Sequence, residues 1–275
     1  MISHNVEYYD SVSSTMTVAK KRAQESAPSG TWIVANEQTT GKGRLGREWL
    51  SERQQGLFTT LILRPQCDVL TKSVHLPHLP QLSLVCGVSL AEIVRAMGVD
   101  NVFVGWPNDV FIRCQRPTPP GQPVYRKLAG ILLESFTLEN GEAVVLVGLG
   151  VNIAEKINVV LPEAIRERYI GLQDCLQGCS FLELRQSMLR SLQDVLTKNY
   201  ENWLTHGFAN THTHFKTMDA YRDCHLLADL GGTGVDGIGE GINHEGGLCI
   251  RTPTGLRTVY TGEVKQVRML SQTSA

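Results

Sequence analysis

Apolar residues recur along this chain with two different periods, and the change of period separates predicted helices from predicted strands. Residues 79–97 and 181–204 carry apolar side chains at helical spacing, so the first predicts a buried helix and the second an amphipathic one. A shorter helix is predicted over residues 15–26, because Ser13 or Ser14 can accept the hydrogen bond that caps its start.

Short apolar runs bounded by turn residues predict strands between these helices. The predicted strands are residues 31–35, 56–63, 102–104, 128–136 and 143–151. The last two form a pair that turns at Glu139-Asn140-Gly141. Beyond residue 220 the pattern changes to short β-like pieces separated by glycine-rich turns. These pieces are residues 248–251, 257–260 and 263–268.

Strands joined by hairpin-like turns favour an α+β fold over a doubly wound parallel sheet, in which helices connect the strands. We therefore expect a mixed, mostly antiparallel sheet with helices over residues 1–219. A small β-barrel domain is expected over residues 220–275. The length of 275 residues is sufficient for one large domain with such an appendage.

Composition narrows the class of function. Hydrophobic residues make up 42% and charged residues 19%, and the net charge of −1 gives no field that would attract nucleic acid or an anionic membrane. No apolar run reaches the length of a membrane span, and the first residues lack the pattern of a secretory signal. Seven cysteines without a CxxC pair indicate a reducing compartment, the cytoplasm, and predict no metal site.

The most informative segment is residues 38–49, which is rich in glycine and in basic residues. Its glycines form a GxGxxG pattern after a predicted strand, at Gly41, Gly43 and Gly46. A dinucleotide-binding turn needs an apolar helix to begin at the third glycine, and the polar residues that follow Gly46 argue against one.

Three cations within six residues suit this segment to binding anions. Lys42, Arg44 and Arg47 can neutralise a carboxylate and a phosphate brought close together, and arginine contacts such groups with two parallel hydrogen bonds. Trp49 offers a flat face for a purine base. The alternative interpretation is a solvated basic loop whose tryptophan belongs to the core.

Two further segments carry candidate chemistry. Trp106-Pro107-Asn108-Asp109 ends a predicted strand and presents an amide beside a carboxylate, which suits ribose, phosphate or Mg²⁺, although such residues are also common in plain turns. Lys127 stands at the entrance of an apolar strand, where it could stabilise charge on an α-phosphate or merely protect a sheet edge. Residues 148–152 combine two glycines with an amide, so backbone can approach a ligand there.

Together, in this order and spacing, these segments resemble the catalytic domain of biotin protein ligases. That family combines a Ser-Thr pair, a glutamine, a Gly-Arg-Gly-Arg-x-Gly-Arg-x-Trp loop, a Lys-Trp-Pro-Asn-Asp turn, a Lys-Leu-Ala-Gly-Ile-Leu strand, a Gly-x-Gly-x-Asn segment and a C-terminal Gly-Glu. The matching positions are Ser14-Thr15, Gln38, residues 41–49, 106–109, 127–132 and 148–152, and Gly262-Glu263. The resemblance covers residues 8–268 and implies a class II synthetase-like catalytic domain followed by an SH3-like barrel.

The resemblance also implies roles for the matching residues. Arg44 and Lys127 are the implied catalytic residues. The implied biotin site consists of Ser14, Thr15, Met16, Gln38, Lys42, Gly43, Arg44, Lys127 and Gly130. The implied ATP and adenylate contacts are Arg47, Trp49, Asn108, Asp109 and Asn152.

The implied reaction joins biotin to ATP, with Mg²⁺, and then transfers biotin to a lysine of a biotin carboxyl carrier domain. We expect a monomer or homodimer. We also expect no DNA-binding helix-turn-helix before residue 8, and hence no nucleic-acid partner.

Three features depart from the family pattern, and they leave alternatives open. Glycine stands at position 105 where the family usually has lysine, Met16 stands where asparagine often occurs, and residues 114–125 form a long proline-rich loop. A lipoate or octanoate protein ligase shares the expected fold. A non-catalytic biotin-binding relative is suggested by Gly105, and a dinucleotide oxidoreductase is the third alternative.

Overall fold

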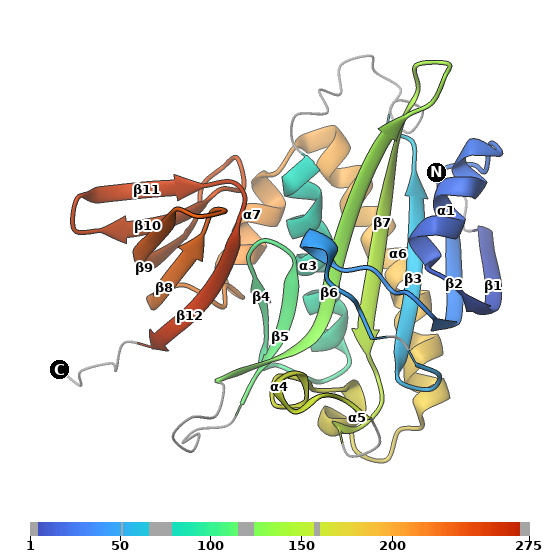
Figure 1. The fold of residues 1–275 in the computed structure, drawn as a ribbon, viewed down its shortest axis with the longest axis horizontal. Coiled ribbons are helices and arrows are strands. Elements are labelled where there is room, and N and C mark those ends of the chain that lie inside the picture. Colours follow the sequence, from blue (N-terminus) through green and yellow to red (C-terminus); the bar gives the residue numbers. More distant parts are fainter. Residues whose placement is uncertain (1–4, 51, 66–78, 115–123, 157–159, 270–275) are drawn as a thin grey trace.

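The protein, described here as a computed structural model, contains two β-sheets with helices beside the larger one (Figure 1). The structure describes residues 5–50, 52–65, 79–114, 124–156 and 160–269. The strands of the larger sheet are β1 (Asn5–Val12), β2 (Thr31–Gln38), β3 (Gly56–Leu63), β4 (Val102–Gly105), β5 (Asp109–Arg113), β6 (Tyr125–Thr137) and β7 (Ala143–Asn152). Their spatial order is β1-β2-β3-β7-β6-β5-β4.

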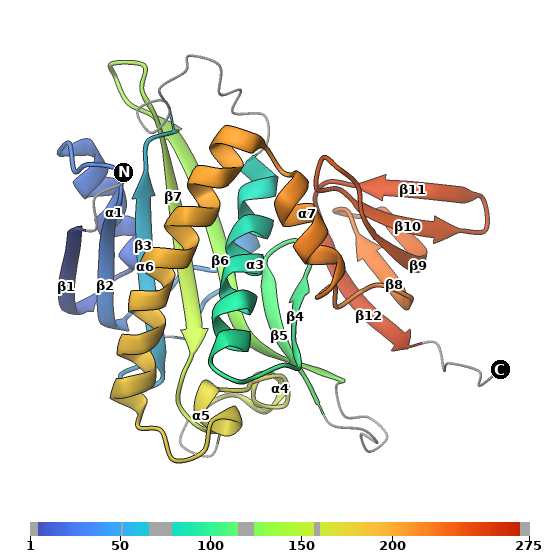
Figure 2. The same cartoon turned by 180° about the vertical axis from the view of Figure 1, so that it is seen from behind.

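Helices cover both faces of this sheet, but unequally. They are α1 (Thr15–Gln24), α3 (Leu79–Ala96), α4 (Glu163–Arg166), α5 (Leu172–Cys175), α6 (Phe181–His206) and α7 (Ala209–Lys216), with a 3₁₀ turn, η1 (Arg44–Gly46). The long helices α3 and α6 pack across one face, as Figure 2 shows. The opposite face carries α1 and the loop with η1 (Figure 1).

The three predicted helices are present because their ends carry the expected signals. Ser14 Oγ accepts a hydrogen bond from the backbone of Met16 at 3.3 Å, which caps α1. Ser180 and Glu183 form a capping box at the start of α6, and Gly207 ends that helix with a positive φ. The sequence did not predict α4, α5 and α7, which are short and carry little periodic signal.

The five strands predicted for the larger sheet are also present, and four of the described strands were missed: β1 and β5 in this sheet, and Cys224–Asp229 and Gly234–Ile242 in the smaller one. β1 is an edge strand whose residues are mostly exposed or half-buried, so its sequence lacks a clear apolar run. It pairs parallel with β2, whereas the other pairs of this sheet are antiparallel. The prediction of a mixed, mostly antiparallel sheet is therefore confirmed. The other strand missed in this sheet is β5, so Asp109 begins a strand and does not belong to a terminal turn.

The smaller sheet is entirely antiparallel, in the order β11-β10-β9-β8-β12. Its strands are β8 (Cys224–Asp229), β9 (Gly234–Ile242), β10 (Leu248–Thr252), β11 (Gly255–Val259) and β12 (Glu263–Met269). The predicted pieces correspond to β10, β11 and β12, and this arrangement is consistent with an SH3-like domain. The boundary predicted between residues 219 and 220 stays a prediction.

A continuous core of buried apolar side chains joins the larger sheet to α3 and α6 and extends into the smaller sheet. A second cluster lies under α1, on the other face. In the part of the chain that the structure describes, no helix is both long and apolar enough to cross a membrane.

The two sheets meet at a buried carboxylate. The backbone of Val104 in β4 accepts from Ala220 at 3.0 Å and donates to Met218 at 2.6 Å, so Asp219 is held against the edge of the larger sheet. Asp219 is 9% exposed. Its Oδ1 accepts from the backbone of Tyr221 at 2.8 Å, but its Oδ2 has no hydrogen-bond partner among the described residues. Burial accordingly raises the pKa of Asp219 to about 6.

This shift predicts a loss of stability as the pH rises. Below its ordinary pKa of 3.8 the Asp219 carboxyl is protonated in both states, whereas between 3.8 and about 6 only the folded state retains the proton. The free energy of unfolding should therefore fall by about 3 kcal/mol over this interval. We expect Asp219→Asn to lack this pH-dependent change. The measurement is the free energy of unfolding by denaturant, for the variant and for the wild type, at pH 4 and at pH 7. If the variant and the wild type differ by the same free energy of unfolding at both pH values, Asp219 does not have the raised pKa.

Candidate functional site

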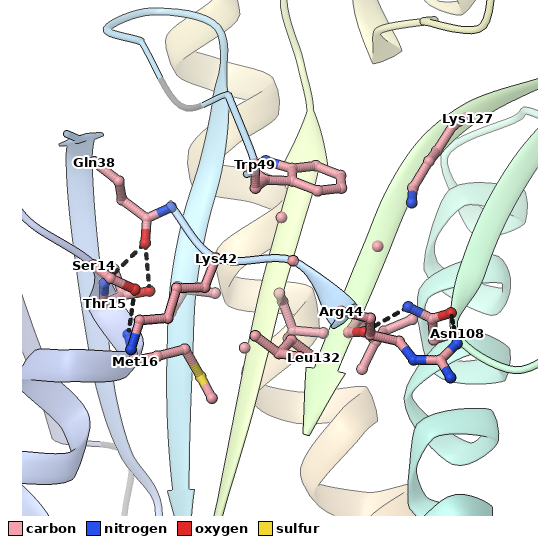
Figure 3. Close-up of a pocket in the computed structure, with 17 residues that line it drawn as sticks. Ser14, Thr15, Met16, Gln38, Lys42, Arg44, Trp49, Asn108, Lys127 and Leu132 are labelled. Carbon is pink, nitrogen blue, oxygen red and sulfur yellow. Dashed lines mark hydrogen bonds between the residues drawn. The ribbon is translucent and has the colours of Figure 1, made fainter. Parts of the chain in front are cut away.

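A pocket lies on the face of the larger sheet that carries α1 and the η1 loop (Figure 3). It contains about 470 Å³ of empty space, part of which is open to solvent. Eleven of the residues predicted for the site line it: Ser14, Thr15, Met16, Gln38, Lys42, Gly43, Arg44, Trp49, Asn108, Lys127 and Gly130. The fold thus brings together segments that the sequence separates by more than a hundred residues.

One end of the pocket is polar and uncharged. The backbone and hydroxyl of Thr15 both donate to Gln38 Oε1, at 2.8 and 3.0 Å, and the Thr60 hydroxyl donates to Thr15 Oγ1 at 2.8 Å. These bonds fix Thr15 at the first turn of α1. Sequence analysis missed Thr60 because a threonine inside an apolar strand has no distinctive pattern.

Met16 forms an apolar wall beside this polar end. The residue is 3% exposed, and its side chain lies close to the pocket in Figure 3. A Cβ at position 148 would lie 2.8 Å from Met16 Sδ, so Gly148 provides the space that the thioether occupies. Leu132 lines the same region. A ligand at this end therefore meets hydrogen-bonding groups on one side and apolar groups on the other.

Two opposed glycines form the floor of the pocket's centre. Gly130 in β6 and Gly150 in β7 are register partners. A Cβ at either position would lie 2.7 or 2.5 Å from ring atoms of Trp49. The indole can therefore lie against the sheet only because both positions lack side chains.

Arg44 is the first of two cations at the far end. Its Nη1 donates to Asn108 Oδ1 at 3.0 Å, and its Nη2 donates to the carbonyl of Gly262 at 3.4 Å. Asn108 is itself fixed, because its Nδ2 donates to the carbonyl of Ile131 at 2.8 Å. The guanidinium is thus positioned by both sheets before any ligand binds.

Lys127 is the second cation. Its Nζ lies 2.7 Å from Asp109 Oδ1 and 5.2 Å from the centre of the Trp49 ring. The carbonyl of Lys127 accepts from Asn152 Nδ2 at 2.9 Å, which fixes the backbone of this part of β6. Charge and aromatic contacts therefore hold the ammonium group over the end of the glycine floor.

Three residues predicted to contact nucleotide are not part of the pocket lining. Asp109 and Asn152 contact Lys127, and Arg47 forms an exposed ion pair with Glu263 at the start of β12. Their predicted contacts with ATP stay predictions. Among the described residues, no group of three or more His, Cys, Asp or Glu side chains could hold a metal ion. Residues 115–123 of the long loop lie outside the described residues.

The pocket combines the features needed to activate a carboxylic acid that has a neutral polar head. The head would lie between Thr15 and Met16, and the acid group would extend toward Arg44 and Lys127. Two fixed cations would offset the repulsion between a carboxylate and a phosphate.

Comparisons with known proteins identify the family and the fold. Residues 8–152 match the Biotin/lipoate A/B protein ligase family. The Bifunctional ligase/repressor BirA of Bacillus subtilis is 27% identical, with 96% of this chain and 75% of that protein covered. The Biotin--[acetyl-CoA-carboxylase] ligase of Paracoccus denitrificans is 31% identical, with 85% and 89% covered. The structure titled Biotin protein ligase from Aquifex aeolicus in complex with biotin and ATP has a TM-score of 0.76 and 26% identity, covering 97% of this chain and 100% of that one.

The glycine floor predicts the effect of a single methyl group. Gly150→Ala should displace the Trp49 indole and destabilise the protein by about 1–3 kcal/mol, the usual cost of overpacking. Tryptophan emission should shift to longer wavelength and be quenched more by acrylamide, with Trp49→Phe giving the background. Gly234→Ala is the matched control, because a Cβ there would lie 3.6 Å from Leu227, an ordinary contact. Identical emission in Gly150→Ala and the wild type would rule out this packing.

Proposed function

Because the chain belongs to the biotin/lipoate A/B protein ligase family, we propose that it is an ATP-dependent biotin protein ligase. It forms biotinyl adenylate from biotin and ATP, and then transfers the biotinyl group to a lysine of an acceptor protein. The observation that carries this proposal is the pocket that runs from a neutral polar end at Thr15 to the cations Arg44 and Lys127.

The polar end suits the ureido group of biotin. Ser14 Oγ accepts from Met16 N, so its hydroxyl proton is available for the ureido oxygen. Thr15 Oγ1 donates to Gln38 and keeps acceptor capacity for a ureido N–H. Lipoate has no ureido group and would leave these polar groups unpaired, which is costly in a buried site. The pocket therefore favours biotin over lipoate.

The far end suits the adenylation step. A carboxylate oxygen of biotin attacks the α-phosphorus of ATP, a new P–O bond forms, and pyrophosphate leaves. Arg44 and Lys127 stabilise the negative charge that builds up on the phosphoryl oxygens, and they hold the two anions in line. Lys42 also lines the pocket, and its side chain extends toward Ser14 and Met16, away from Arg44 (Figure 3). Trp49 covers the glycine floor and keeps water from the adenylate.

The transfer step needs little further machinery. The neutral amine of the acceptor lysine attacks the acyl carbon, the C–N bond forms, and the C–O bond to AMP breaks. The amine loses a proton to solvent as AMP leaves. Arg44 keeps its contact with the phosphate during this step and stabilises the leaving group.

Mg²⁺ would enter as the counterion of ATP. Asp109 is the predicted carboxylate contact, and in this structure it is paired with Lys127. Mg²⁺ prefers oxygen ligands, so the phosphate oxygens of ATP would supply part of its coordination shell.

The acceptor that fits the relatives is the biotin carboxyl carrier domain of a biotin-dependent carboxylase, since the Paracoccus relative is named for acetyl-CoA carboxylase. A cytoplasmic location and a monomeric or homodimeric state stay predictions. The absence of a nucleic-acid partner is also a prediction, because several relatives are named as ligase and repressor together.

The deciding experiment is pyrophosphate release from Mg-ATP with biotin or lipoate as the sole acid. We expect release with biotin alone, and release with lipoate would move the chain to the other branch of the family. If neither acid supports release although biotin binds, the chain is a binding protein and the ligase assignment is wrong.

Removing the Arg44 guanidinium should impair adenylation strongly. We expect Arg44→Ala to slow pyrophosphate release and weaken adenylate retention by about 2–4 kcal/mol, the range for a preorganised charge contact. Arg53→Ala is the control, because Arg53 pairs with Asp10 on the surface and does not line the pocket. Wild-type rate and retention in Arg44→Ala would remove Arg44 from the mechanism.

A further inference from the structure

The ion pair between Asp109 and Lys127 has an unusual position for the proposed reaction. Lys127 lines the pocket, whereas Asp109 contacts it from the start of the neighbouring strand β5. The side chains are 33% and 25% exposed, so solvent only partly screens their charges. The Asp109 carboxylate therefore competes with an anionic substrate for the Lys127 ammonium group.

The local sequence explains why Asp109 has Lys127 as its counterion. Position 105 is the cross-strand partner of Asp109 in the β4–β5 hairpin, and it carries glycine. The ring of Phe111 occupies the space beside it, because a Cβ at position 105 would lie 2.1 Å from Phe111 Cε2. A side chain of any kind at position 105 would require this ring to move. The partner position across the hairpin therefore provides no cation for Asp109.

Phe111 is also held in place by neighbouring aromatic rings. Its centroid lies 6.1 Å from that of Tyr125 and 6.4 Å from that of Tyr221. Tyr221 is buried, and the Asp109 charge contributes, after burial itself, to raising the pKa of its hydroxyl. These three rings lie near Asp109 and carry no positive charge.

The pair is close but not aligned as a hydrogen bond. Asp109 Oδ1 lies 2.7 Å from Lys127 Nζ, yet it has no partner of hydrogen-bond geometry among the described residues. Such a contact gains Coulomb attraction without the directional part of a charge-assisted hydrogen bond. The ammonium group can therefore turn to a phosphate or carboxylate oxygen without breaking an aligned hydrogen bond, and the cost of leaving the buried Oδ1 uncompensated opposes anion binding.

We propose that Asp109 is a positioning residue that acts as the resting counterion of Lys127, and that Lys127 leaves it for the phosphate when ATP binds. This inference rests on the proposed function and concerns the same site. Asp109 then lowers the affinity of the pocket for anions while it keeps Lys127 over the glycine floor. The glycine at position 105 causes this arrangement, because it leaves Asp109 without a cross-strand cation.

The test is a double-mutant cycle on nucleotide binding. Titration calorimetry measures ATP binding in the presence of biotin and EDTA, where adenylation is suppressed and a carboxylate cannot act by holding Mg²⁺. We expect Asp109→Asn to bind ATP about fivefold more tightly, the scale of one partly exposed ion pair. In the Lys127→Met background the same substitution should change ATP affinity by less than about twofold, since its partner is absent.

Each other outcome contradicts the proposal. Unchanged or weaker ATP binding in Asp109→Asn would mean that the carboxylate does not compete for Lys127. Equal effects of Asp109→Asn with and without Lys127 would mean that Asp109 acts on the nucleotide directly. Asp109→Glu preserves the charge, so this variant should bind ATP about as tightly as the wild type does. If Asp109 had only a structural role, Asp109→Glu would change ATP affinity as much as Asp109→Asn does.

A second variant should release Lys127 from Asp109 through a change in the neighbouring strand β4. Gly105→Lys combined with Phe111→Val supplies a cross-strand cation for Asp109 and removes the ring that blocks it. ATP binding should tighten about as much as in Asp109→Asn, and adding Asp109→Asn should then have little effect. ATP affinity equal to that of the wild type in this variant would overturn the link to position 105.

Failure of the proposed function looks different. If the wild type binds ATP but releases no pyrophosphate with biotin, the ligase assignment fails while the cycle still decides the role of Asp109. If the wild type adenylates biotin but the cycle shows no coupling, the role of Asp109 fails and the ligase assignment stands. If the wild type does not bind ATP, both are wrong.

Discussion

The pocket depends on the register of β6 against β7. That register places Gly130 directly opposite Gly150, and only this pair leaves the space in which the Trp49 indole can lie flat on the sheet. The indole in turn supports the Lys127 ammonium, 5.2 Å from its ring centre. A shift of one residue between the strands would turn side chains toward the ring and remove the floor. The backbone hydrogen bonds between β6 and β7 thus determine the position of the Lys127 ammonium group.

The second constraint is that neither sheet completes the charged end alone. Arg44 is held by Asn108 from the larger sheet and by the carbonyl of Gly262 at the start of β12. The same loop carries the ion pair between Arg47 and Glu263. The residues at the start of β12 therefore position the anion-binding loop, in addition to the packing of the smaller sheet against the core.

Much of this could be predicted from the sequence, and the failures have physical causes. The glycine and basic residues of the loop indicated an anion site because their chemistry is local, and the cap at Ser14 located α1. The pairing of Asp109 with Lys127 could not be foreseen, because it depends on the register and the bulge between β5 and β6. Nor could the contact of Arg44 with Gly262, which joins residues 218 positions apart. The edge strand β1 was missed because it lacks a buried face.

The order in which these contacts appear along the chain has a consequence for synthesis on the ribosome. The Thr15–Gln38 pair joins residues only 23 positions apart, so this hydrogen bond needs only the first strands and α1. The Arg44 contact with Gly262 cannot form until residue 262 has left the exit tunnel, 218 positions after Arg44. During synthesis the Arg44 guanidinium would therefore lack one of its two hydrogen-bond acceptors until the last strands of the smaller sheet have been made.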